Sequence, residues 1–157
     1  MASLYLNELK VPLIVTNDDS TALIRGRFFP GAGAILQSIT TACRLKKGSH
    51  VRSTSVEEPG TYDLIGKPNP FTIDLIKEEH GLSQNSRTIM IGDRPNTDIL
   101  FGKAGGLDQC LVLSGVVRGM DDFKSNWLSE NQEYAPTYIM QMVGDLDAAA
   151  TVTTAAQ

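Results

Sequence analysis

Apolar and polar positions divide the second half of the chain into short strands and helices in alternation. Four short apolar runs, bounded by glycine, proline or polar residues, predict strands at residues 62–65, 88–91, 109–113 and 137–140. The run at 88–91 is apolar at nearly every position, as in parallel strands that are buried on both faces. Helical segments separate these strands, and this order is typical of a doubly wound α/β sheet.

Capping residues set the limits of the helices. Asn69 suits the N-cap of a helix over residues 70–79, and Gly81 suits the position after its end. The apolar residues of this helix fall on one face: Phe71, Leu75 and Ile76. A second helix is predicted over 97–104, closed by two glycines, and a short one over 143–149.

The first part of the chain has a less regular α/β pattern. A β-branched run predicts a strand over 11–16, a second strand is expected over 25–29, and a helix over 34–43. Residues 45–60 are rich in Lys, Ser, Glu and Gly without periodicity, so we expect an exposed loop there. Within it, residues 46–59 are interpreted as a surface insertion.

Length and composition are those of a globular protein with one or two units. The chain has 157 residues, of which 41% are hydrophobic and 20% charged. We place a boundary near Gly66, giving units 1–65 and 66–157.

A net charge of −4 argues against nucleic acid as a partner. With no run long enough to cross a bilayer, no secretory signal, and Cys43 and Cys110 far apart, we expect a cytoplasmic protein with two free thiols.

Two aspartates follow the strand at 88–91. Asp93 comes directly after Gly92, and Asp98 lies in the first turn of the next predicted helix. Ligands of open parallel sheets bind at the carboxyl ends of the strands, and paired carboxylates there suit Mg²⁺. A turn aspartate followed by a carboxylate that the helix dipole favours would give the same pattern. The two aspartates alone therefore leave both interpretations open.

Lys67 favours the first interpretation. It lies just past the strand at 62–65 and immediately before the helix at 70–79. A lysine in that position can neutralise phosphate oxygens and a nearby carboxylate as a point charge. A lysine and an acidic pair at strand ends of one sheet predict a combined anion and metal site for phosphoryl transfer.

Six stretches occur in the order of a known family. They are Val15–Asp19, Phe29–Gly33, Gly66–Pro70, Gly92–Ile99, Leu113–Val116 and Ala135–Ile139. Together they resemble the C-terminal half of the haloacid dehalogenase (HAD) superfamily, in its capped branch of p-nitrophenylphosphatases, phosphoglycolate phosphatases and pyridoxal phosphatases. The resemblance implies a partial Rossmann-like, three-layer parallel sheet with the second half of an α/β cap.

The same resemblance implies an activity and a site. Members hydrolyse small phosphate monoesters, such as p-nitrophenyl phosphate or phosphoglycolate, with Mg²⁺ and an aspartyl-phosphate intermediate. By position, Lys67 would be the charge-neutralising lysine, Asp93 the direct Mg²⁺ ligand, and Asp98 a holder of metal-bound water or of Lys67. Asn69 and Asn17 are candidates for contacting a small phosphorylated metabolite.

The family's attacking aspartate has no equivalent that we can find. It belongs to an Asp-x-Asp-Gly motif that precedes the cap, and the sequence opens inside the cap. Asn17-Asp18-Asp19 follows a strand but starts with Asn, which cannot form an acyl phosphate. Asp145-Leu146-Asp147 lies in a predicted helix. We therefore expect a C-terminal portion of a phosphatase that is inactive when isolated.

Two other functions fit parts of the pattern. A truncated, non-catalytic homologue would act by association, as a homodimer or through the exposed edge of its half-sheet. A receiver-type signalling domain also joins Lys to acidic residues, but there the Lys follows the acidic cluster, whereas Lys67 precedes Asp93. The predicted loop at residues 20–25 contains no His, so it does not indicate a substrate.

Overall fold

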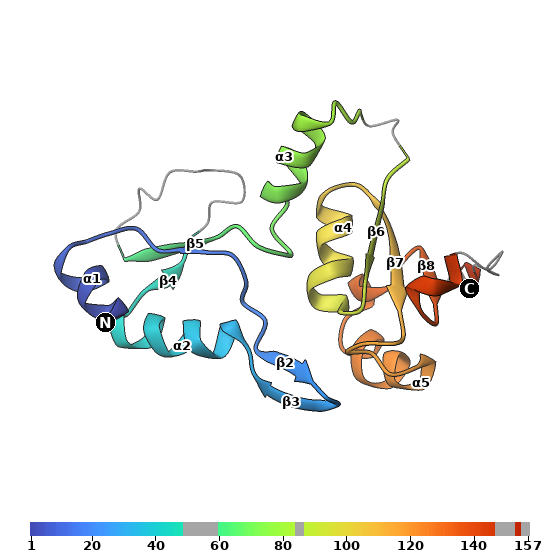
Figure 1. The fold of residues 1–157 in the computed structure, drawn as a ribbon, viewed down its shortest axis with the longest axis horizontal. Coiled ribbons are helices and arrows are strands. Elements are labelled where there is room, and N and C mark those ends of the chain that lie inside the picture. Colours follow the sequence, from blue (N-terminus) through green and yellow to red (C-terminus); the bar gives the residue numbers. More distant parts are fainter. Residues whose placement is uncertain (49–59, 84–86, 147–152, 155–157) are drawn as a thin grey trace. The chain divides into compact units, whose positions relative to one another are not determined.

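The computed structural model describes residues 1–48, 60–83, 87–146 and 153–154, and the chain divides into two compact units, Met1–Leu75 and Ile76–Gln157. Both units combine helices with a parallel sheet, which confirms the α/β class (Figure 1). None of the helices in the described ranges has the length and apolar run that a bilayer crossing requires. The boundary expected near Gly66 stays a prediction.

The first unit contains a three-stranded parallel sheet, a hairpin and two helices. Its elements are α1 (Ala2–Glu8), β1 (Ile14–Val15), β2 (Thr21–Ile24), β3 (Arg27–Pro30), α2 (Ala32–Cys43), β4 (Lys46–Lys47) and β5 (Thr61–Leu64). Strand β5 lies between β1 and β4, with Val15 opposite Leu64 and Lys47 opposite Tyr62. The carboxyl ends of all three strands therefore lie at one edge of the sheet.

Three expectations for this unit need correction. Residues 20–25 were expected to be a loop, but Thr21–Ile24 form β2, which pairs antiparallel with β3 in a hairpin. The strand expected over 25–29 is present as β3, shifted to Arg27–Pro30. The two residues between them, Arg25 (φ +50°) and Gly26 (φ +75°), both have positive φ, as a two-residue hairpin turn requires. Lys46 and Lys47 form strand β4 rather than loop, because they pair with β5. Residues 49–59 of the expected insertion lie outside the described residues.

Helix α3 (Phe71–Glu79) contains the boundary between the units. Its start was predicted correctly, since the Asn69 side chain accepts a hydrogen bond from the backbone N–H of Phe71 at 2.9 Å. Gly81 after its end has φ +61°. Along α3, Ile73 is buried, while Leu75 and Ile76, two residues of the expected apolar face, are 49% and 41% exposed.

The second unit is a four-stranded sheet with helical segments. Its elements are β6 (Ile89–Gly92), the π-helical turn η1 (Pro95–Ile99), α4 (Leu100–Ala104), β7 (Asp108–Val112), α5 (Met120–Asp122), η2 (Phe123–Leu128, π-helical), η3 (Gln132–Tyr134, 3₁₀), β8 (Tyr138–Met140), η4 (Val143–Leu146, 3₁₀) and β9 (Thr153–Thr154). Strands β6, β7 and β8 are parallel, and β9 pairs antiparallel with β8.

The helix expected over 97–104 starts earlier, as a π-helical turn at Pro95. The helix expected over 143–149 is a 3₁₀ turn as far as Leu146, and its remainder lies outside the described residues.

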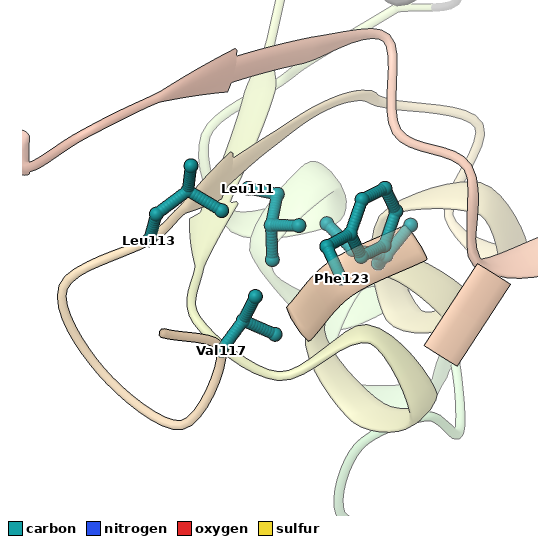
Figure 2. Packing of buried hydrophobic residues seen from close by; sticks show 5 residues of the cluster. Leu111, Leu113, Val117 and Phe123 are labelled. Atoms are coloured by element: carbon teal, nitrogen blue, oxygen red, sulfur yellow. The ribbon is translucent and has the colours of Figure 1, made fainter. Parts of the chain in front are cut away.

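One face of this sheet carries the main core of the unit. Leu111 and Val117 are fully buried and pack with Ile99, Leu113 and Phe123 (Figure 2). Partly buried side chains extend the cluster: Trp127, Leu128 and Ile139. These residues come from β7, the loop after it, η1, η2 and β8, so the core fixes the loops at the carboxyl ends of β6 and β7.

The other face of the sheet is less completely covered. Cys110, Val112 and Met140 are buried there with Ile91 and Tyr138 against them, but Ile89 is 45% exposed. Strand β6 was expected to be buried throughout. Among the described strands it is instead at the edge of its sheet, with β7 as its neighbour on one side, and an edge position leaves part of its apolar surface open.

Candidate metal site at the carboxyl end of strand β6

Residues 92–98, called here the acidic loop, run from the last residue of β6 into η1 and are closed by Asp98. One carboxylate oxygen of Asp98, Oδ2, accepts hydrogen bonds from the backbone N–H groups of Asp93 (3.1 Å) and Arg94 (3.0 Å). The backbone N–H of Asp98 donates in turn to the carbonyl of Arg94 at 2.8 Å. Asp98 is only 3% exposed, so its carboxylate fixes the loop from inside.

Gly92 makes this closure sterically possible. A Cβ at residue 92 would collide with the Cβ, Cγ and Oδ2 atoms of Asp98. The glycine therefore gives the Asp98 side chain the space to reach the backbone at the end of the strand.

Asp93 is held by the loop that follows β7. Its Oδ2 atom accepts a hydrogen bond from the backbone N–H of Val116 at 2.8 Å, and its carbonyl accepts one from Val117 at 3.4 Å. A Cβ at Gly115 would collide with Oδ2 of Asp93. Gly115 and Val116 were recognised in the sequence only as part of a motif. Their position after the strand next to β6 is the signal that could have assigned them to the site.

The second oxygen of Asp93 is the atom best placed to bind a ligand. Asp93 is half-buried, and within the described ranges no hydrogen bond or ion pair engages its Oδ1. A single carboxylate oxygen completed by waters and phosphate oxygens is a usual form of Mg²⁺ ligation. No group of three or more His, Cys, Asp or Glu side chains suited to a metal occurs in the described part of the chain. The residues present therefore fit part of a Mg²⁺ shell rather than a complete protein cage.

Lys67 follows β5 in the first unit, on a loop that is held by backbone contacts. A Cβ at Gly66 would collide with the carbonyl oxygen of Thr16, so the loop passes directly against the end of β1. The Asn69 side chain donates to the carbonyl of Leu64 at 2.6 Å and accepts from Phe71. Its amide thus joins the strand end to the start of α3. The Lys67 side chain is exposed to solvent.

Residues 17–19 form a turn after β1 in the same unit. The Asn17 side chain accepts a hydrogen bond from the backbone N–H of Asp19 at 2.7 Å, and Asp18 forms an ion pair with Lys47 at 3.7 Å. Burial raises the pKa of Tyr62, and the negative charge of Asp18 raises it further. The carbonyl of Asp19 accepts from Gly33 at the start of α2. These contacts give the segment a structural role.

The structure thus brings Asp93 and Asp98 together in one loop of the second unit. Lys67, Asn69 and Asn17 belong to the first unit, where Lys67 and Asn17 follow neighbouring parallel strands. Both cysteines are free thiols, with Cys110 buried and Cys43 half-buried.

Comparisons of sequence and of structure with known proteins relate the chain to phosphatases. A sequence profile of the HAD-hydrolase-like family matches residues 64–146. The chain is 32% identical over 146 residues to glycerol-3-phosphate phosphatase of Rattus norvegicus, and the match covers 90% of this chain but 40% of the relative. The 4-nitrophenylphosphatase from Thermotoga maritima has a similar structure, with a TM-score of 0.68, 26% identity, and coverage of 95% of this chain and 48% of that one.

A third protein shares the fold at lower identity. Glycerol phosphate phosphatase from Mycobacterium tuberculosis, solved in complex with magnesium, gives a TM-score of 0.67 at 23% identity, over 92% of this chain and 37% of that one. The chain therefore spans less than half the length of each of these relatives. The resemblance of its motifs to the capped phosphatase branch is confirmed. Because the family profile matches more than half of its residues, the chain belongs to the HAD-hydrolase-like family.

Proposed function

We propose that the chain forms the metal-binding part of a Mg²⁺-dependent HAD-type phosphatase that hydrolyses small phosphate monoesters. The observation that carries the proposal is the position of Asp93 at the carboxyl end of β6, with Oδ2 held by Val116 and Oδ1 not engaged within the described residues. The names of two relatives, a glycerol-3-phosphate phosphatase and a 4-nitrophenylphosphatase, support the substrate class.

Each candidate residue of the two units has a separate proposed role. Asp93 would bind Mg²⁺ directly, and Asp98 would fix the backbone of Asp93 and hold metal-bound water. Lys67 would neutralise phosphate oxygens. Mg²⁺, when bound, would offset negative charge on the transferring phosphoryl group. Asn17 and Asn69 stay candidates for substrate contact, although the side-chain nitrogen and oxygen of Asn69 and the side-chain oxygen of Asn17 already bond to backbone groups.

The attacking carboxylate must come from elsewhere. Asp98 is unsuitable, because its Oδ2 accepts two backbone N–H groups and its side chain is 3% exposed. Asp93 is the proposed Mg²⁺ ligand and is therefore not the nucleophile. We therefore propose that the aspartyl-phosphate forms on an aspartate outside the described residues, and that the chain alone turns over no phosphate ester.

A non-catalytic function is the alternative. In that case the chain would associate with another protein through the exposed edge of its sheet, and the acidic loop would have a structural role only. Within the described residues, β6 pairs with a strand on one side only, which is compatible with this alternative. The two proposals differ in whether Asp93 binds Mg²⁺.

Calorimetric titration of the purified chain with MgCl₂ separates them. We expect weak binding that Asp93→Asn abolishes and Asp145→Asn, a substitution in η4 away from the acidic loop, retains. Hydrolysis of p-nitrophenyl phosphate should be absent in the chain alone. Mg²⁺-dependent hydrolysis that Lys67→Ala and Asp93→Asn both remove would show that a nucleophile is present. Equal Mg²⁺ affinity in the chain and in Asp93→Asn would refute the proposed metal ligand.

A further inference from the structure

Residues 20–48 have a positive charge that is opposite in sign to that of the whole chain. Five of the 14 basic residues lie in this segment: Arg25, Arg27, Arg44, Lys46 and Lys47. None of the 18 acidic residues does, so the segment has a formal charge of +5 in a chain whose net charge is −4. Such a local concentration of charge attracts anionic partners to one part of the surface.

Two of these arginines lie at the turn of the β2–β3 hairpin, which extends beyond the start of α2 (Figure 1). Arg25 has φ +50°, although the first position of this kind of turn favours Asn, Asp or Gly. Arg27 begins β3. Both side chains are exposed, and among the described residues neither guanidinium takes part in an ion pair or a hydrogen bond. Their two charges are therefore available to an anion from outside the described residues.

One face of the hairpin combines these charges with apolar side chains. Ile24 is opposite Arg27, so their side chains share a face. Phe29 lies two positions further along β3 and points to the same side. A hollow of about 620 Å³ is lined by Ile24, Arg25, Arg27 and Phe29. A ligand in this hollow would contact two guanidinium groups together with an aliphatic and an aromatic side chain.

We propose that this face of the hairpin binds an acidic peptide segment of a partner protein, in which carboxylates flank an apolar side chain. Guanidinium groups pair with carboxylates in a bidentate geometry, and arginine and aromatic residues are enriched in protein interfaces. The carboxylates bind Arg25 and Arg27, and the apolar side chain packs against Ile24 and Phe29. The proposal does not depend on the acidic loop or on the proposed phosphatase activity.

Two other occupants fit this face less well. A second copy of the chain that paired its hairpin symmetrically with this one would bring the arginines of both copies together, and like charges repel. A lipid surface favours apolar side chains at the deepest point of an inserted turn, whereas here the two arginines lie at the turn and Phe28 and Phe29 follow them. An acidic peptide satisfies both the charged and the apolar side chains.

Fluorescence anisotropy with a defined probe tests the proposal. The probe is a fluorescein-labelled hexapeptide, Glu-Asp-Leu-Phe-Asp-Glu, titrated with the purified chain. We expect saturable binding that weakens at least tenfold in Arg25→Glu and in Arg27→Glu, and that weakens as NaCl is added. Arg44→Glu is the matched control, because Arg44 is an exposed arginine of the same unit with a similar φ, +56°, and does not line the hollow. It changes the net charge equally and should keep the affinity within about twofold.

Phe29→Ser tests the apolar part of the site. It should weaken binding of the probe at least fivefold, whereas Phe28→Ser should not, because Phe28 is opposite Leu23 on the other face of the hairpin. The two phenylalanines are 45% and 55% exposed, so the substitutions remove similar rings from the surface. Two control peptides leave the protein unchanged. Lys replaces every acidic residue in one, Ser replaces Leu and Phe in the other, and we expect neither to bind.

Four results would overturn the proposal. They are the absence of saturable probe binding, equal binding of the basic control peptide, an equal loss in Arg27→Glu and Arg44→Glu, and a dimer of the chain that Arg27→Glu dissociates. Binding to vesicles of phosphatidylserine and phosphatidylcholine without binding to the probe would assign the hairpin to a lipid surface and refute the peptide site. Circular dichroism shows whether each variant is folded, and the comparison of the three peptides does not depend on any variant.

Discussion

The Oδ2 atom of Asp98 lies 3.1 Å from the backbone nitrogen of Asp93, so the second aspartate of the acidic loop fixes the position of the first. The same oxygen accepts the N–H of Arg94 at 3.0 Å. Asp98 is almost fully buried, and a role in holding the loop does not depend on a bound metal. Of the two interpretations left open by the sequence, the helix-terminal carboxylate therefore describes Asp98, and the metal ligand stays a proposal for Asp93.

Asp98→Ala should destabilise the chain strongly. The substitution leaves the N–H groups of Asp93 and Arg94 without their acceptor in a buried position, and the expected loss is about 2–4 kcal/mol in the free energy of unfolding. Asp98→Asn keeps an acceptor oxygen and should lose less. Urea unfolding followed by circular dichroism measures both. Asp145→Ala is the control, because Asp145 accepts the N–H of Met142 at 3.0 Å at an exposed site. A loss in Asp98→Ala no larger than that of the control would contradict this role.

Gly115→Ala should weaken Mg²⁺ binding by displacing Asp93. The added methyl group would overlap Oδ2 of Asp93, and the side chain or the loop must move, at a cost of about 1–3 kcal/mol. We expect at least a tenfold loss of Mg²⁺ affinity in calorimetric titration. Gly144→Ala is the matched control, since the nearest atom to its added Cβ would be Sδ of Met142 at 4.0 Å. An unchanged affinity in Gly115→Ala would show that the loop after β7 does not position Asp93.

Local signals in the sequence were sufficient to predict the three parallel strands of the second unit. The strands around 88–91, 109–113 and 137–140 were predicted within about one residue, because each is an apolar run bounded by turn residues. The cap at Asn69 was also predicted from residue type. These signals act over three or four residues, which is why the boundaries that they set are correct.

Features that depend on distant contacts were not predictable in this way. Positive φ at Arg25 is not expected from its residue type, and the hairpin was missed. No element was predicted for the segment after Gly119, although Phe123, Trp127 and Leu128 contribute to the core from it. The contact of Val116 with Asp93 joins residues 23 positions apart. Only the pairing of β6 with β7 brings them together.

Cys110 should react slowly with alkylating reagents. The thiol is fully buried in the sheet, and burial raises its pKa above the ordinary value, so both access and the thiolate fraction are low. In a Cys43→Ser background, we expect iodoacetamide to modify Cys110 at pH 8 at least a hundredfold more slowly than N-acetylcysteine. The rate should increase as the pH is raised further. In the reverse variant, Cys110→Ser, the alkylation rate of half-buried Cys43 is measured for comparison with that of Cys110. Reaction of Cys110 at the rate of the free thiol would show that this part of the sheet opens readily.

Asp122 should stabilise the helical segment after Gly119 in a pH-dependent way. The backbone N–H of Arg118 donates to Oδ2 of Asp122 at 2.7 Å, and the Asn126 amide donates to its Oδ1 at 2.8 Å. These two hydrogen bonds, the backbone one first, lower the pKa of Asp122, with the nearby charge of Arg118 adding to the effect. Because the folded-state pKa is lowered, the stabilisation is complete above the ordinary aspartate pKa and is lost as the pH falls through the lowered value.

Asp122→Asn should therefore reduce the free energy of unfolding by about 1 kcal/mol at pH 7, a value that allows for partial solvent exposure. The difference from the unsubstituted chain should shrink as the pH is lowered from 5 to 3, because the carboxylate that is being replaced becomes protonated. Urea unfolding at several pH values gives both quantities. Asp121→Asn removes the same charge from the neighbouring exposed residue, and within the described residues Asp121 makes no such hydrogen bonds. If the two variants lost the same stability at every pH, net charge rather than the contacts of Asp122 would explain the effect.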